Sequence, residues 1–128
     1  MFTLSVLQGK ENGTYLEIGS ADPYYGSNTA LLEEFKWKGV SVEIEKSLTD
    51  KFKDERSNEV ICADATKLDY DEILSRISDE DNVIDYLQLD CDPPEITYQV
   101  TKMIPFDKYK FRVITFEHDR WYSGDHIY

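Results

Sequence analysis

The stretch "YLEIGSADPYYGSNTALLEEFKWKGVSVEIE", residues 15–45, contains the pattern that decides the fold. It opens with the apolar, strand-like segment 15–18 and continues into a polar loop. Apolar residues then recur at helical spacing over residues 28–37, and we expect Gly39 to end that helix. Residues 40–44 predict a second strand. A strand, a helix and another strand in direct succession are typical of a parallel β-α-β unit.

The remainder of the chain repeats this alternation. We predict further strands over residues 59–63, 83–90 and 111–116, and further helices that open at residues 47–50, run over residues 70–78 and begin at Pro93-Pro94. The segment 83–90 is almost continuously apolar, as expected of a strand covered on both faces. The sequence therefore predicts an α/β protein with a parallel sheet and helices on both faces.

Composition and charge limit the function. The chain has 128 residues, 41% of them hydrophobic, which predicts a single domain over residues 1–128. Its net charge is −12, from 26 acidic and 14 basic residues, and such a surface repels nucleic acid. The sequence shows no apolar run of about 20 residues and no signal peptide, so we expect a cytoplasmic protein without a membrane partner. We expect Cys62 and Cys91 to be buried, reduced thiols.

Acidic residues lie at the end of every predicted strand or directly after it. They are Glu17, Glu43, Glu45, Asp64, Asp90, Asp92, Glu117 and Asp119. In parallel sheets, ligands bind beyond the carboxyl ends of the strands, so these side chains are candidates for a binding site.

These acids, together with Gly19, indicate a pocket for a nucleoside. A glycine after the first strand lets a ligand approach the backbone closely. An acid after the second strand can accept hydrogen bonds from ribose hydroxyls, and an acid after the third can accept one from the exocyclic amine of adenine. The glycine-rich phosphate-binding motifs G-x-G-x-x-G and G-K-S/T are absent. An adenosine compound with a positively charged tail, such as S-adenosylmethionine, fits this pattern.

The quoted stretch resembles the FkbM-like branch of class I S-adenosylmethionine-dependent methyltransferases. Members have a strand that ends in Glu/Asp-x-Gly, a Ser-Asn-Thr sequence before a Leu-Glu helix, a Trp-x-Gly turn, and a strand that ends in an acid. Further on, "IDYLQLDCDPPE" and "VITFEHD" are similar to the fourth and fifth strands of the family. The resemblance covers roughly residues 8 to 122. It implies a Rossmann-like, doubly wound and mainly parallel sheet of about five strands, in the order 3-2-1-4-5.

The resemblance also implies a function, methyl transfer to a hydroxyl of a sugar or another small-molecule acceptor. The residues that it assigns to S-adenosylmethionine are Glu17, Gly19, Ser20, Asn28, Glu43, Asp64, Ala65 and Asp90. Within this set Glu43 would hold the ribose hydroxyls, with Glu45 as the alternative.

Removal of a proton from the acceptor needs a base, for which Asp92 and His118 are the candidates. A second possibility is that acids from the fourth and fifth strands hold Mg²⁺, which would orient two substrate hydroxyls.

Class I methyltransferases usually add a sixth strand and an antiparallel seventh, whereas this sequence stops soon after the fifth. We therefore expect the fifth strand to be a sheet edge, covered by a second copy in a homodimer or by the C-terminal residues. The alternative function is a catalytically inactive, truncated Rossmann-like domain that binds a nucleoside or serves in assembly.

Overall fold

The computed structural model describes residues 12–19, 29–90 and 94–116. The elements in chain order are β1 (Thr14–Ile18), α2 (Thr29–Glu34), β2 (Lys38–Glu43), α3 (Lys46–Glu55), β3 (Glu59–Cys62), the 3₁₀ helix η1 (Ala65–Lys67), α4 (Tyr70–Ile77), β4 (Val83–Leu89), α5 (Pro94–Met103) and β5 (Lys110–Phe116). None of the described helices is long and apolar enough to cross a membrane.

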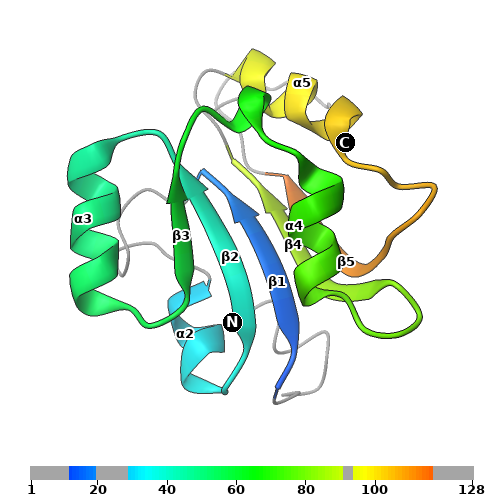
Figure 1. Ribbon diagram of the computed structural model, residues 1–128, viewed down its shortest axis with the longest axis horizontal. Helices are drawn as coiled ribbons and strands as arrows, with labels where there is room; N and C mark the ends of the chain where they lie inside the picture. Colours follow the sequence, from blue (N-terminus) through cyan, green and yellow to red (C-terminus); the bar gives the residue numbers. More distant parts are fainter. Residues whose placement is uncertain (1–11, 20–28, 91–93, 117–128) are drawn as a thin grey trace, which may run out of the picture.

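The described strands form one parallel sheet in the order β3-β2-β1-β4-β5 (Figure 1). β1 lies at its centre, where Leu16 is opposite Val40 on β2 and Leu87 on β4. The predicted strand order 3-2-1-4-5 and the Rossmann-like α/β class are thereby confirmed. Because the strands are parallel, their carboxyl ends meet along one edge of the sheet.

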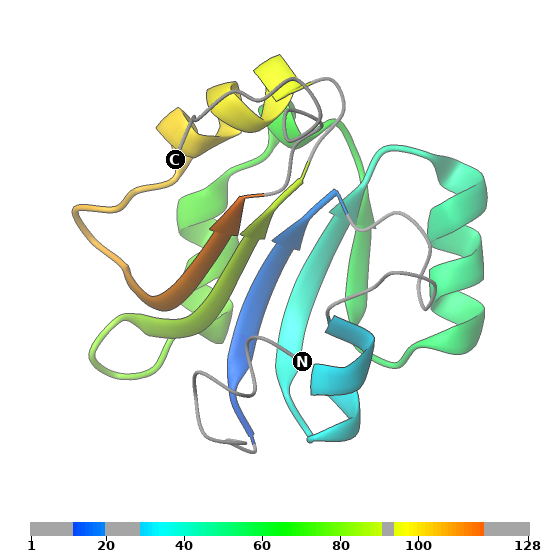
Figure 2. The same ribbon diagram turned by 180° about the vertical axis from the view of Figure 1, so that it is seen from behind.

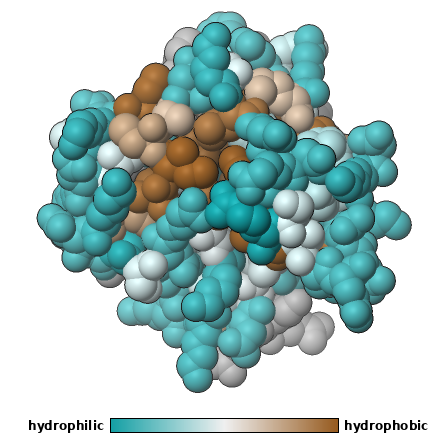
Figure 3. All heavy atoms as spheres, in the orientation of Figure 1, coloured by the Kyte–Doolittle hydropathy of each residue, from teal (hydrophilic) through white to brown (hydrophobic). Residues whose placement is uncertain are grey.

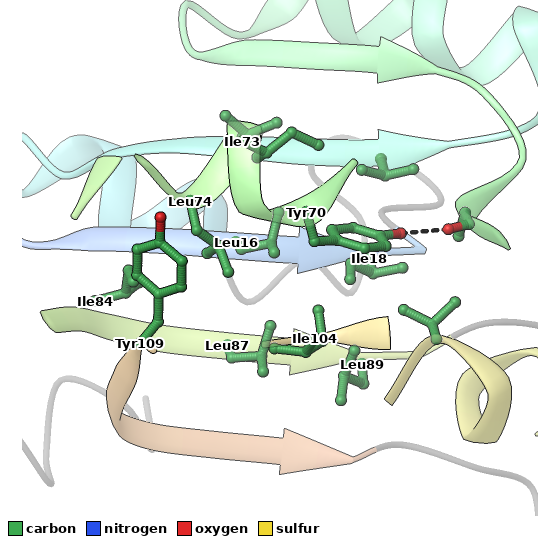
Figure 4. Close-up of a cluster of buried hydrophobic side chains, with 14 residues drawn as sticks. Leu16, Ile18, Tyr70, Ile73, Leu74, Ile84, Leu87, Leu89, Ile104 and Tyr109 are labelled. Carbon is green, nitrogen blue, oxygen red and sulfur yellow. Dashed lines mark hydrogen bonds between the residues drawn. The ribbon is translucent and has the colours of Figure 1, made fainter. Parts of the chain in front are cut away.

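The larger part of the core lies on the face covered by α4 and α5. Figure 4 shows how side chains from β1, β4 and α4 meet there. Leu16 of β1, Leu74 of α4 and Val100 of α5 are fully buried in this cluster. Burial of each such side chain contributes roughly 1.5–3 kcal/mol.

A smaller aromatic cluster lies on the opposite face. Its buried members are Tyr15, Leu32, Trp37, Tyr86 and Val113. Figure 2 shows α2 on this side of the sheet, with α3 beside it. Helices therefore cover both faces, as predicted.

α2 ends earlier than the sequence pattern indicates. The N–H of Trp37 donates to the carbonyl of Leu32 (3.1 Å), and the N–H of Lys36 donates to that of Glu33 (3.0 Å). With Lys36 in the left-handed region at φ 67°, these bonds form a Schellman motif. The expectation that Gly39 ends the helix was wrong, because Gly39 lies within β2.

Gly39 is required by packing. A Cβ atom at this position would lie 2.5 Å from ring atoms of Tyr15 on the neighbouring strand. Glycine therefore allows the tyrosine ring to lie flat against β2 in the aromatic cluster.

β3 and β5 are the edges of the described sheet. Ile114 and Phe116 on β5 are 39% and 45% exposed. Cys62 at the end of β3 is also exposed, which corrects the expectation of a buried thiol, because an edge strand is covered on fewer sides than a central one. Cys91 is outside the described residues. A second copy against β5 remains a prediction.

Candidate functional site

Backbone hydrogen bonds continue beyond the strand ends and join four segments along the carboxyl edge. The N–H of Asp90, after β4, donates to the last carbonyl of β1 (2.9 Å). The N–H of Gly19, after β1, donates to the carbonyl of Val42 on β2 (2.8 Å). The N–H of Ala63, after β3, donates to the carbonyl of Glu43 (3.1 Å). Since neighbouring strands are about 4.8 Å apart, the edge presents these segments as a continuous row.

Gly19 begins the segment that leaves the sheet after β1. Its φ is 86°, a conformation that residues with a Cβ atom rarely adopt. The turn itself therefore requires glycine. The missing side chain also leaves room for a ligand to approach the backbone closely.

Glu43 is the last residue of β2 and is half-buried. Its Oε2 accepts a hydrogen bond from the N–H of Glu45 over 2.9 Å, which holds the carboxylate at the edge of the sheet. Glu45 itself is exposed and precedes α3 without a hydrogen bond from its side chain to the helix. The two acids that the sequence offered as alternatives thus differ, and Glu43 is the more restrained.

Asp64 and Ala65 follow β3. Asp64 Oδ1 accepts from the N–H of Thr66 (2.9 Å) and from its hydroxyl (2.7 Å), so the side chain caps η1. These two bonds, the backbone one foremost, lower the pKa of Asp64 below its ordinary value. Ala65 is buried, and its carbonyl accepts from the Tyr70 hydroxyl over 2.5 Å. This segment is therefore fixed to α4 and carries a carboxylate that stays ionised near neutral pH.

Glu17 has a different environment, because its side chain is completely buried on the face covered by α2. Its Oε1 accepts from the hydroxyls of Thr29 (2.9 Å) and Ser41 (2.7 Å), and its Oε2 accepts from the Gln88 amide (3.4 Å). Buried carboxylates require such partners. Glu17 therefore joins β1, β2, β4 and α2, two residues before Gly19 in the chain.

Ile44 was not singled out from the sequence. It follows Glu43 at the carboxyl edge and is 66% exposed, which is unusual for a large aliphatic residue. On the face of Figure 1, apolar surface is also visible over the upper ends of β2 and β3 (Figure 3). The sequence signal was present but weak, since Ile44 reads as one more apolar strand residue.

Several of the predicted site residues lie outside the described part of the chain. They are Ser20, Asn28, Asp92 and His118. Asp90 is described and is half-buried after β4. Among the described residues no group of three or more His, Cys, Asp or Glu side chains is placed to hold a metal ion. The acids proposed for Mg²⁺ are mostly outside that part, so the metal remains a prediction.

The architecture is shared with a solved structure. The crystal structure of the PH0226 protein from Pyrococcus horikoshii OT3 matches with a TM-score of 0.56 and 24% sequence identity. The match covers 96% of this chain and 55% of that protein, so the chain spans about half the length of its structural neighbour. No protein-family model and no curated protein matches the chain. At this identity the likeness defines the class as an α/β domain with a Rossmann-like fold.

Proposed function

We propose that the protein is an S-adenosylmethionine-dependent methyltransferase of the FkbM-like branch, acting on a hydroxyl of a sugar or another small metabolite. The observation that carries the proposal is the row formed by Gly19, Glu43 and Asp64 along the carboxyl edge. In that row Gly19 would let the ligand approach the backbone closely, Glu43 would accept from the ribose hydroxyls, and Asp64 would accept from the adenine amine. The three residues lie at the ends of strands that are adjacent in the sheet.

The described residues fit an adenosyl group. The Glu43 carboxylate, restrained by the N–H of Glu45, would accept from the ribose hydroxyls. Asp64 would accept from the exocyclic amine, and the exposed side chain of Ile44 would lie against the purine ring. Apolar contact with polar groups at the rim is typical of small-molecule sites.

Charge supports a cationic guest. The chain carries a net charge of −12, and acids follow β2, β3 and β4 at this edge. The sulfonium and ammonium groups of S-adenosylmethionine would be attracted there, whereas a pyrophosphate would be repelled. This favours S-adenosylmethionine over a dinucleotide.

Methyl transfer from a sulfonium to an oxygen is an in-line displacement, in which the bound cofactor supplies the methyl group. Much of the catalysis then comes from alignment of donor and acceptor. In the proposal, Asp90 and Asp92 lie where donor and acceptor meet, and Asp92 or His118 takes the proton from the acceptor hydroxyl. Mg²⁺ would assist if acids after β4 and β5 bind it.

Calorimetric titration with S-adenosylhomocysteine and S-adenosylmethionine tests the binding part of the proposal. We expect saturable binding of one molecule per chain for both. Transfer of a labelled methyl group should then be measured with a panel of sugars and small hydroxyl compounds. Binding with transfer supports a methyltransferase, and binding without transfer to any acceptor supports the alternative of a nucleoside-binding module. No binding to either compound contradicts both of these and leaves the alternative of an assembly module.

A further inference from the structure

Arg56 is a buried charged residue that the proposed chemistry does not use. It follows α3, and only 6% of the residue is exposed. Its guanidinium lies over the ring of Phe52, with 4.4 Å between the guanidinium carbon and the ring centre. A buried guanidinium needs acceptors for its N–H groups and a negative charge nearby.

Among the described residues, hydrogen-bond acceptors for the Arg56 guanidinium come from α2 and β1. Its Nε donates to Glu33 Oε2 over 2.6 Å, and its Nη2 donates to the hydroxyls of Thr29 (3.1 Å) and Tyr15 (3.4 Å). Thr29 and Glu33 are four residues apart, so they lie on the same side of α2. Arg56 therefore holds the first turn of α2 against the sheet.

The Thr29 hydroxyl continues this contact to Glu17. It accepts from Arg56 and at the same time donates to Glu17 Oε1 over 2.9 Å. One hydroxyl thus connects a buried cation with a buried anion. Loss of either side would leave a buried charge with fewer partners, which is costly.

We infer that Arg56 is a positioning residue for the candidate site, and that it acts through Thr29 to hold both the Glu17 carboxylate and the start of α2. In the sequence, Glu17 and Gly19 precede segment 20–28 and Thr29 follows it. The expected consequence rests on the proposed function: the contact from Arg56 through Thr29 to Glu17 should raise the affinity for the adenosyl ligand.

The first test compares three threonine variants. Thr29→Val has the same shape but removes the hydroxyl, and Thr29→Ser restores it. Thr49→Val is the matched control, since Thr49 is also buried but its hydroxyl donates within α3, to the carbonyl of Lys46 (2.8 Å). We expect Thr29→Val to weaken S-adenosylhomocysteine binding about tenfold, as for the loss of a hydrogen bond to a charged group. Thr29→Ser and Thr49→Val should stay within about twofold of the native chain. Equal affinities for the two valine variants would overturn the inference while leaving the proposed function intact.

The second test needs no ligand and separates the two ideas if the native chain does not bind. Amide hydrogen exchange is measured at Gly19 and Asp90, whose N–H groups donate across the carboxyl edge. We expect exchange there to accelerate at least several-fold in Thr29→Val and in Arg56→Lys, and to be unchanged in Thr49→Val. Acceleration of this kind supports the positioning role even without binding. Unchanged exchange at both amides in Thr29→Val would overturn it.

Discussion

The N–H of Ala63 donates a hydrogen bond to the carbonyl oxygen of Glu43 over 3.1 Å, one residue beyond the end of β3. This bond joins the acid proposed for ribose to the segment proposed for adenine. The backbone therefore holds together two parts of the proposed ligand site without the help of a ligand. Such preorganisation lowers the entropy cost of ligand binding. Substitution of single side chains at this edge is therefore expected to change affinity without rearranging the site.

Glu43→Gln should weaken S-adenosylhomocysteine binding. Hydrogen bonds to a charged group contribute roughly 1.5–3 kcal/mol, which corresponds to a loss of about ten- to a hundredfold. Calorimetry provides the measurement. Glu80→Gln is the control, because Glu80 is an exposed acid before β4, at the opposite edge of the sheet. An effect of similar size in both variants would show that general charge, and not the position of Glu43, attracts the ligand.

Ile44→Ala should weaken the same binding by about three- to tenfold, because part of the apolar contact with the purine is lost. The stability of the free protein should change by less than about 0.5 kcal/mol, since this side chain is mostly exposed. Ile114→Ala, the same change at an exposed position on β5, is the matched control. If the two alanine variants bind equally well, the purine does not contact Ile44.

Gly39→Ala should lower the free energy of unfolding of the protein, whether or not a ligand is bound. The new methyl group would meet the Tyr15 ring at 2.5 Å, and overpacking of this kind costs about 1–3 kcal/mol. Urea denaturation measures the loss. The cost should shrink when Gly39→Ala is made in a Tyr15→Val background, because the ring is then gone. An equal cost in both backgrounds would argue against the contact.

Much of the fold could be predicted from the sequence because each strand and helix has its own periodicity. The helices on both faces, and the strand order 3-2-1-4-5 that the family resemblance implied, are confirmed. The positions at which helices and strands end were harder to predict. The pattern suggested that Gly39 ends a helix, but Lys36 takes the left-handed conformation and Gly39 accommodates Tyr15. A glycine that is needed for packing between strands cannot be told from a glycine that ends a helix when only the sequence is read.

The environment of Glu17 could not be predicted. Its partners Thr29, Ser41 and Gln88 are 12, 24 and 71 residues away in sequence, and they meet only because the sheet forms and α2 packs on it. The sequence indicated that an acid lies at the end of the first strand, but it did not show that this acid is buried. Ile44 was missed for a related reason, because the exposure of an apolar residue depends on where its strand ends.

The pKa of Asp64 offers a test of the geometry after β3. Hydrogen bonds from Thr66 hold this pKa below its ordinary value of 3.8. A depressed pKa means that the carboxylate adds stability above about pH 4, and that this contribution is lost as the pH falls through the folded-state pKa. NMR titration of the Asp64 carboxyl carbon should give a value below 3.8 in the native chain. In Thr66→Val it should rise part of the way back, since the backbone bond remains. An unshifted Asp64 in the native chain would mean that the cap is not formed.

β5 should pair with a second copy along its outer edge. Light scattering is then expected to give twice the chain mass of 15.0 kDa, and amides of residues 110–116 should exchange slowly. A monomeric mass together with fast exchange along this strand would contradict the dimer. That outcome would leave the proposed adenosyl-binding residues Gly19, Glu43 and Asp64 unaffected, because they lie at the ends of β1, β2 and β3 and β4 separates β1 from β5.

Binding of an adenosyl compound at the carboxyl edge of β1 to β4, as proposed, can be followed residue by residue in an NMR titration of the labelled chain with S-adenosylhomocysteine. We predict saturable shifts of the backbone signals of Gly19, Glu43, Ile44, Asp64 and Ala65, with little change at the opposite edge around Glu80. An unchanged spectrum at a high ligand concentration, or shifts centred elsewhere on the molecule, would show that this edge of the sheet does not bind an adenosyl compound.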